Sequence, residues 1–139
     1  MPMHAILGNE MLSVSSEPDL IAVRNKARLH ARAAGFGLTD ETKLVTAVSE
    51  LARNMISHGG GGQALIEDLE QNGRQGIRVT FTDRGPGIAN IGQAMQDGYS
   101  SINGLGLGLP GARRLVHDFE IKSSAKEGTH IVIVRWNRC

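Results

Sequence analysis

Residues 104–111 read Gly-Leu-Gly-Leu-Gly-Leu-Pro-Gly, and this stretch does most to decide the fold of the sequence. The alternating glycines Gly104, Gly106 and Gly108 leave backbone N–H groups that can approach a ligand closely. Pro110 suits the first position of a helix, whose positive end would face the same space. The pattern therefore favours a bound phosphate group. A flexible linker is the alternative, although a linker has little use for regularly spaced leucines.

Two common phosphate-binding motifs do not explain this stretch. Residues 106–111 match Gly-x-Gly-x-x-Gly, but no strand leads into them, as the dinucleotide-binding fold requires. The P-loop pattern Gly-x-x-x-x-Gly-Lys-[Ser/Thr] occurs nowhere in the sequence. Both of these nucleotide-binding classes are therefore excluded.

A second set of polar residues lies on a predicted helix upstream. The helix is expected to be capped by Thr39 or Asp40 and to end at His58. Its apolar stripe consists of Leu44, Val48, Leu51 and Met55. Glu50, Asn54 and His58 are spaced by four and so project from one face. Carboxylate and carboxamide oxygens suit Mg²⁺, which takes its other ligands from water and phosphates. A solvated helix face is the alternative.

A third set of residues fits the recognition of a purine base. Asp83 ends a strand-like run and is followed by Gly85 and Gly87, which let the chain turn sharply against a ligand. An aspartate there can accept a hydrogen bond from the amine of adenine, where guanine presents a carbonyl. The hydroxyl of Thr129, at the start of the last predicted strand, could complete the pocket. A turn with an aspartate cap is the alternative.

The remaining pattern predicts one α+β domain over residues 1–139. One helix is expected to begin at Glu17 and to be stopped by Gly35 and Gly37, and another is expected from Pro110 through Val116. Residues 84–103 show no sustained period and predict a surface loop with at most one short helix. The strand-like runs are 11–15, 64–70, 77–82, 119–123 and 129–136, with a hairpin loop at 72–76. This order suggests helices on one face of a mixed or antiparallel sheet.

The composition restricts the classes of partner that the sequence suggests. Lysine and arginine number 15 against 14 acidic residues, and no long basic run is present, which weighs against nucleic acid. No apolar run is long enough for a membrane span and the start lacks the features of a secretory signal, so we expect a cytoplasmic protein. The lone cysteine, Cys139, excludes a disulfide framework and is assigned no role.

Taken together, these stretches resemble the GHKL ATP-binding superfamily, the Bergerat-type fold shared by histidine kinases, gyrase, Hsp90 and MutL. The N box corresponds to residues 50–58, the G1 box to 83–87 and the G2 box to 104–109. The resemblance covers nearly the whole chain, with no appended dimerisation or transducer domain. This compactness is similar to the small anti-sigma-factor serine kinases. Residues 83–88, 97–100 and 106–115 resemble most the RsbT-type switch kinases of stress signalling.

The resemblance implies a GHKL sandwich, with helices on one face of a mixed β-sheet, that binds ATP and Mg²⁺. It implies that Asn54 coordinates Mg²⁺ and that Asp83 accepts the adenine amine. Gly85 and Gly87 would shape the base pocket, and Thr129 would help to hold adenine. The segment that would close over the phosphates comprises Gly104, Leu105, Gly106, Leu107 and Gly108.

The resemblance also implies an activity. Glu50 matches the general base, which in the kinase members acts on a serine or threonine hydroxyl of a partner rather than on water. The expected partner is a STAS-domain antagonist, and the released kinase is expected to activate a PP2C-type phosphatase by binding. His58 matches a loosely defined position of the N box, so we do not assign it to a phosphate contact.

The leading hypothesis is therefore a protein serine/threonine kinase in bacterial stress or sigma-factor regulation. A second class stays open, a nucleotide-responsive binding module that acts as an anti-sigma factor or phosphatase co-activator without essential catalysis. A sensor histidine kinase would need a phosphoaccepting histidine on a separate helical hairpin, and neither His30 nor His58 has the chain around it to form one. Gyrase-type and Hsp90-type ATPases need further domains.

Overall fold

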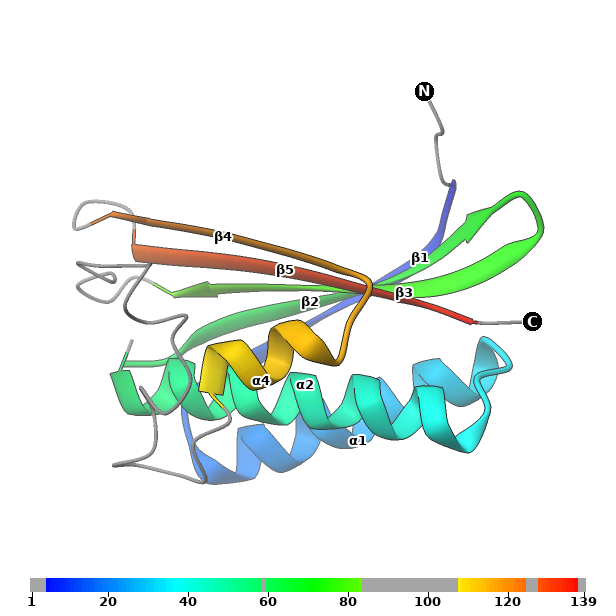
Figure 1. Ribbon diagram of the computed structural model, residues 1–139. Coiled ribbons are helices and arrows are strands. Elements are labelled where there is room, and N and C mark those ends of the chain that lie inside the picture. The colour runs from blue at the N-terminus through cyan, green and yellow to red at the C-terminus, as the bar shows by residue number, and fades with distance from the viewer. Residues whose placement is uncertain (1–4, 59, 84–107, 125–127, 138–139) are drawn as a thin grey trace.

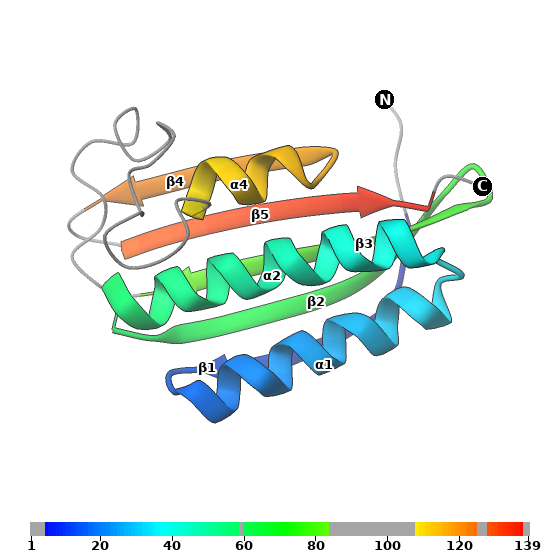
Figure 2. The same ribbon diagram turned by 60° about the horizontal axis from the view of Figure 1, so that its bottom comes forward.

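The computed structural model describes residues 5–58, 60–83, 108–124 and 128–137. Their helices and strands form two layers, with the three helices of these ranges on one face of a sheet (Figures 1 and 2). In chain order the elements are β1 (Ala5–Val14), α1 (Glu17–Ala33), α2 (Leu38–His58), β2 (Gly62–Gln71), β3 (Arg74–Asp83), α4 (Gly108–Arg114), β4 (Asp118–Ser124) and β5 (Gly128–Trp136). The α+β sandwich predicted from the sequence is confirmed.

The described strands form a five-stranded sheet in the order β1-β2-β3-β5-β4. Every neighbouring pair is antiparallel, so of the two sheets left open by the sequence the antiparallel one is present, not a mixed one. The β2–β3 hairpin closes through Asn72 and Gly73, which both have positive φ (55° and 78°). Asn-Gly is the pair that tolerates this tight turn. The strands therefore run further than expected, and the loop is shorter than the predicted 72–76.

Several element boundaries differ from the sequence prediction, and those of β1, α2 and α4 bear most on the fold. The first strand begins at Ala5 rather than at residue 11, because backbone pairing to β2 continues to Ala5 although the apolar alternation does not. The helix α2 begins at Leu38, so Thr39 and Asp40 lie inside its first turn rather than at its cap. The helix α4 begins at Gly108 instead of Pro110 and ends at Arg114, before the expected Val116.

The main core lies between the sheet and the helices. The predicted apolar stripe of α2 is confirmed, since Leu44, Val48, Leu51 and Met55 are all buried. A smaller apolar cluster, made of Leu69, Val134 and Trp136, is separate from this core. The helix α2 is therefore held by its apolar face. Among the described helices, none is both long enough and apolar enough to cross a membrane.

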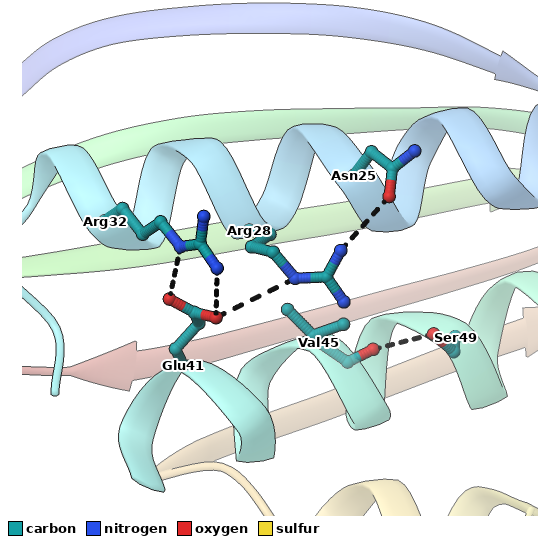
Figure 3. Close-up of polar contacts among 6 residues, drawn as sticks. All are labelled: Asn25, Arg28, Arg32, Glu41, Val45 and Ser49. Carbon is teal, nitrogen blue, oxygen red and sulfur yellow. Dashed lines mark hydrogen bonds and ion pairs between the residues drawn. The ribbon is translucent and has the colours of Figure 1, made fainter. Parts of the chain in front are cut away.

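The helices α1 and α2 are joined by a shared carboxylate (Figure 3). Glu41, at the start of α2, is buried and accepts a 2.9 Å hydrogen bond from Arg32 Nε near the end of α1. Arg28 Nε lies 3.7 Å from the other carboxylate oxygen. Because these contacts join the end of one helix to the start of the next, they fix the antiparallel pairing of the two helices.

Arg135 of β5 ties the start of α2 to the end of α4. Its buried guanidinium forms an ion pair with Asp40 and donates a 2.8 Å hydrogen bond to the carbonyl of Leu115. His117 adds two bonds to β5, accepting from Trp136 N–H and donating its own backbone N–H to Val134, each at 2.9 Å. Burial and the nearby charge of Arg135 lower the pKa of His117, which suits an imidazole that accepts a hydrogen bond. The end of α4 is thus fixed to the sheet.

Candidate active site

The predicted site residues that the structure describes gather at one end of the sandwich. The last turn of α2, the end of β3 and the start of β5 lie side by side there (Figures 1 and 2). The backbone N–H of Gly61 donates a 3.0 Å bond to the carbonyl of Met55, which ties the end of α2 to the segment entering β2. Gly62 pairs with Asp83, and a Cβ placed on Gly62 would lie 2.9 Å from both Asp83 Cα and Met55 Sδ. The end of α2 and Asp83 therefore both lie against Gly62, one on each side of it.

Asp83 and Thr129 are brought into contact from positions 46 residues apart. The backbone N–H of Thr129 donates a 3.2 Å hydrogen bond to Asp83 Oδ1. Both residues are buried, with 7% and 6% of their surface exposed. A buried carboxylate held in this way has a fixed direction and is a strong acceptor, because water competes little for it. The arrangement can recognise an amine such as that of adenine.

Thr129 has a second partner on the neighbouring edge strand. Its hydroxyl oxygen lies 2.8 Å from Ser123 Oγ, which is a hydrogen bond in which either oxygen can donate. Ser123 of β4 stands directly opposite Thr129 in the antiparallel register. Sequence reasoning did not find Ser123. The strand pattern alone could not pair it with Thr129, because the register of two antiparallel strands depends on the exact turn between them.

Glu50 and Asn54 lie on the polar side of α2, as predicted. Both are partly exposed, whereas their neighbours Leu51 and Met55 are buried. Glu50 Oε1 lies 3.5 Å from Nη1 of Arg53, whose side chain is 45% exposed. An ion pair this exposed contributes little to stability, so it is easily exchanged for another contact. The carboxylate and the carboxamide are thus held by a rigid helix and remain able to meet a ligand.

Several predicted residues cannot be placed. Gly85, Gly87 and the segment 104–107, which includes Leu105 and Leu107, lie outside the described residues. Gly108 is described as the first residue of α4, whose Leu109 and Ala112 are buried in the core that α2 also lines. His58 is the last residue of α2, and its side chain is outside the described part.

Comparison with known families identifies the class. Residues 39–138 match the family described as histidine kinase-, DNA gyrase B- and HSP90-like ATPase. This range contains Glu50, Asn54, Asp83 and Thr129 together with four of the five strands. The chain belongs to this ATPase family, and as a member of it uses ATP.

Within the family, the chain belongs to the RsbT-type serine/threonine kinases. It is 42% identical to the serine/threonine-protein kinase RsbT of Bacillus subtilis (strain 168) over 125 residues, which cover 90% of this chain and 94% of that kinase. It is also 32% identical to the anti-sigma F factor of Clostridium kluyveri over 101 residues, 69% of this chain and 70% of that protein.

A solved structure shares the fold. The RsbU and RsbW domains of Rv1364c from Mycobacterium tuberculosis align with a TM-score of 0.63 and 21% identity over the whole of this chain. The aligned part is 33% of that longer chain, so the present chain spans about a third of its length.

Proposed function

We propose that this kinase transfers the γ-phosphoryl group of ATP to a serine or threonine of a STAS-domain antagonist protein, in the partner switching that controls a bacterial stress response or sigma factor. The observation that supports this most is the 3.2 Å bond between Asp83 and Thr129 at the end of the molecule where α2 ends. A base-recognising pair and the helix with Glu50 and Asn54 meet at that end.

Asp83 supports the choice of adenine. Its carboxylate is buried and its direction is set by the Thr129 N–H, so an amine can approach it in only a narrow range of directions. A guanine carbonyl at the same position would face the carboxylate and leave both acceptors unpaired, at a cost of about 1–3 kcal/mol. Asp83 would therefore bind the adenine amine and disfavour GTP.

Glu50 and Asn54 support phosphoryl transfer. Bound ATP and Mg²⁺ would supply the phosphoryl group and neutralise its charge. Asn54 would hold the metal through its carboxamide oxygen, a ligand type that Mg²⁺ prefers. Glu50 would accept the proton of the partner's hydroxyl as that oxygen bonds to the γ-phosphorus and the bond to ADP breaks. The Glu50 side chain is 18% exposed, which leaves it within reach of a docked partner.

We also propose a second role for the same protein. After it phosphorylates the antagonist, the released kinase would bind a PP2C-type phosphatase and activate it by contact. The similarity to both a kinase and an anti-sigma factor supports a chain that works by docking as well as by catalysis. The expected place of action is the cytoplasm, where ATP and these partners would be met.

Phosphoryl transfer can be tested with purified protein, labelled ATP, Mg²⁺ and a STAS-domain partner. The wild type should form phosphoserine or phosphothreonine on the partner. Glu50→Gln should lower the rate about 100- to 10,000-fold, because the general base is lost. Glu70→Gln, the same change on the exposed far end of β2, is the matched control and should keep the rate.

Two results would contradict the proposal. Persistent absence of label on the partner with wild-type protein would exclude the kinase reaction. An unchanged regulatory output of the Glu50→Gln variant in cells would favour the alternative, a nucleotide-responsive binding module without essential catalysis.

A further inference from the structure

We propose that Ser123 is a positioning residue of the adenine site, which orients the hydroxyl of Thr129 and thereby strengthens the preference for ATP over GTP. This inference rests on the proposed roles of Asp83 and Thr129 in holding the base. It adds a third strand to the site, because Ser123 lies on β4 while Asp83 and Thr129 lie on β3 and β5.

The contacts of Thr129 leave it little freedom. Its backbone N–H is fixed by Asp83 Oδ1 at 3.2 Å, and its hydroxyl is fixed by Ser123 Oγ at 2.8 Å. Ser123 and Thr129 are directly opposed in the β4–β5 ladder, so the hydroxyl pair is held by the register of the sheet. Because Thr129 is only 6% exposed, water competes weakly with Ser123 as partner. Ser123 therefore sets the direction of the hydroxyl.

The direction of this hydroxyl decides whether it donates to or accepts from a ligand, because a threonine hydroxyl has one proton and two lone pairs. If Ser123 donates to Thr129, the proton of Thr129 is left for another acceptor. The edge of adenine next to its amine presents such an acceptor, the unprotonated ring nitrogen N1. Guanine has a protonated nitrogen at that position. A Thr129 hydroxyl that offers its proton therefore matches adenine and opposes guanine, in the same sense as the Asp83 carboxylate.

A purely structural role of Ser123 predicts a different result. A hydroxyl pair across two strands stabilises a sheet to a small extent, whatever ligand is bound. Its loss would lower stability and weaken ATP and GTP binding by the same factor. The ratio of the two dissociation constants therefore separates a positioning role from a structural one.

The experiment is a calorimetric titration with non-hydrolysable ATP and GTP analogues in the presence of Mg²⁺. Ser123→Ala should weaken binding of the ATP analogue about five- to tenfold, as expected for one lost neutral hydrogen bond, and leave GTP-analogue binding nearly unchanged. Ser123→Thr, which keeps the hydroxyl, should restore the wild-type ratio. Ser13→Ala, an exposed position on the opposite edge strand, is the matched control and should change neither constant.

The outcomes separate the two proposals. A wild-type protein that does not bind the ATP analogue would refute the proposed function and this inference with it. Selective binding by the wild type, with the same ATP-to-GTP ratio in Ser123→Ala, would overturn the inference alone. Thermal unfolding of each variant checks the fold. Should Ser123→Ala unfold, Ser123→Cys, which keeps the shape with a weaker donor, should show an intermediate ratio, and an unchanged ratio would again overturn the inference.

Discussion

Replacement of His30 by glutamine tests how the helix layer is attached at the β1 edge of the sheet. Both ring nitrogens of His30 face carboxylates, with Nδ1 at 2.8 Å from Asp68 of β2 and Nε2 at 2.9 Å from Glu10 of β1. Lys26 lies 3.2 Å from the other oxygen of Glu10. Two acceptors can be satisfied only if both nitrogens bear a proton. The contacts of His30 with Glu10 and Asp68, called the His30 clamp below, therefore require the imidazolium form.

The clamp gives stability a defined pH dependence. Burial lowers the pKa of His30, but the bonds to Glu10 and Asp68 outweigh it, and the net pKa is raised above the ordinary 6.5. A raised pKa means that the contribution is complete below about pH 6.5 and is lost as pH rises through the folded-state pKa. The bond to His30 lowers the pKa of Glu10 from 4.5, so its contribution is complete above pH 4.5 and is lost on acidification. The clamp is therefore strongest between about pH 4.5 and 6.5.

The size of the effect follows from the exposure of the groups. Hydrogen bonds to charged groups contribute about 1.5–3 kcal/mol when well shielded. Here Glu10 and Asp68 are 34% and 30% exposed, so solvent screening reduces each bond to about 1 kcal/mol. His30→Gln should therefore lower the free energy of unfolding by about 2 kcal/mol near pH 6. Near pH 9 the difference should fall to about 1 kcal/mol or less, because neutral imidazole keeps only one donor.

Urea unfolding followed by circular dichroism, at intervals from pH 5.5 to pH 9, measures this difference. His130→Gln is the matched control, since it makes the same change at a histidine whose side chain contacts the Thr82 hydroxyl at 3.3 Å instead of two carboxylates. A difference between wild type and His30→Gln that is constant with pH, or that grows as pH rises, would refute the assignment of an imidazolium clamp.

Three further substitutions test the site and the frame that holds it. Asp83→Asn should weaken ATP binding at least tenfold in calorimetry, since the fixed carboxylate acceptor is lost, with little loss of helix content. Unchanged affinity would show that Asp83 does not bind the base. Gly62→Ala should lower the free energy of unfolding measured in urea by about 1–3 kcal/mol and also weaken ATP binding, because its Cβ would clash with the Thr82 carbonyl oxygen and lie 2.9 Å from Asp83 Cα and Met55 Sδ. Wild-type stability would show that the strands can shift. Arg135→Met should lower the free energy of unfolding in urea by about 3–5 kcal/mol, since the buried ion pair between Arg135 and Asp40 is broken. Asp40→Leu in the same chain should recover part of this loss, and no recovery would contradict the assignment of the loss to this pair.

The helix α2 shows what could be predicted from the sequence. Its apolar residues recur at helical spacing, and a single period determines both the buried stripe and the opposite face with Glu50 and Asn54. Its start could not be placed, because Thr39 and Asp40 are both good caps. In the structure Asp40 forms an ion pair with Arg135, 95 residues further along the chain.

The contacts of the candidate site needed the tertiary structure. The sequence could place Asp83 and Thr129 each at the end of a strand, but their bond depends on β3 and β5 being neighbours, although they are not consecutive in the chain. The same holds for Ser123, whose hydroxyl gives no local signal within a strand. His30 was considered only as a phosphoacceptor, since no spacing rule relates it to two carboxylates on separate strands.

The way α2 is fixed explains how a small chain can keep Glu50 and Asn54 in place. Its first turn is held by Asp40 and Glu41 through arginines of β5 and α1, and its last turn is held by the bond from Gly61 to Met55. These two anchor regions are about 21 Å apart along the helix axis, at 1.5 Å per residue. A helix fixed at both ends and packed along its apolar face cannot rotate, so its polar face keeps one direction. Asp83 and Thr129 are held by the sheet instead. Glu50 and Asn54 are thus positioned by helix contacts and the Asp83–Thr129 pair by the sheet, and the two sets of contacts meet at Gly62, which lies between Met55 and Asp83.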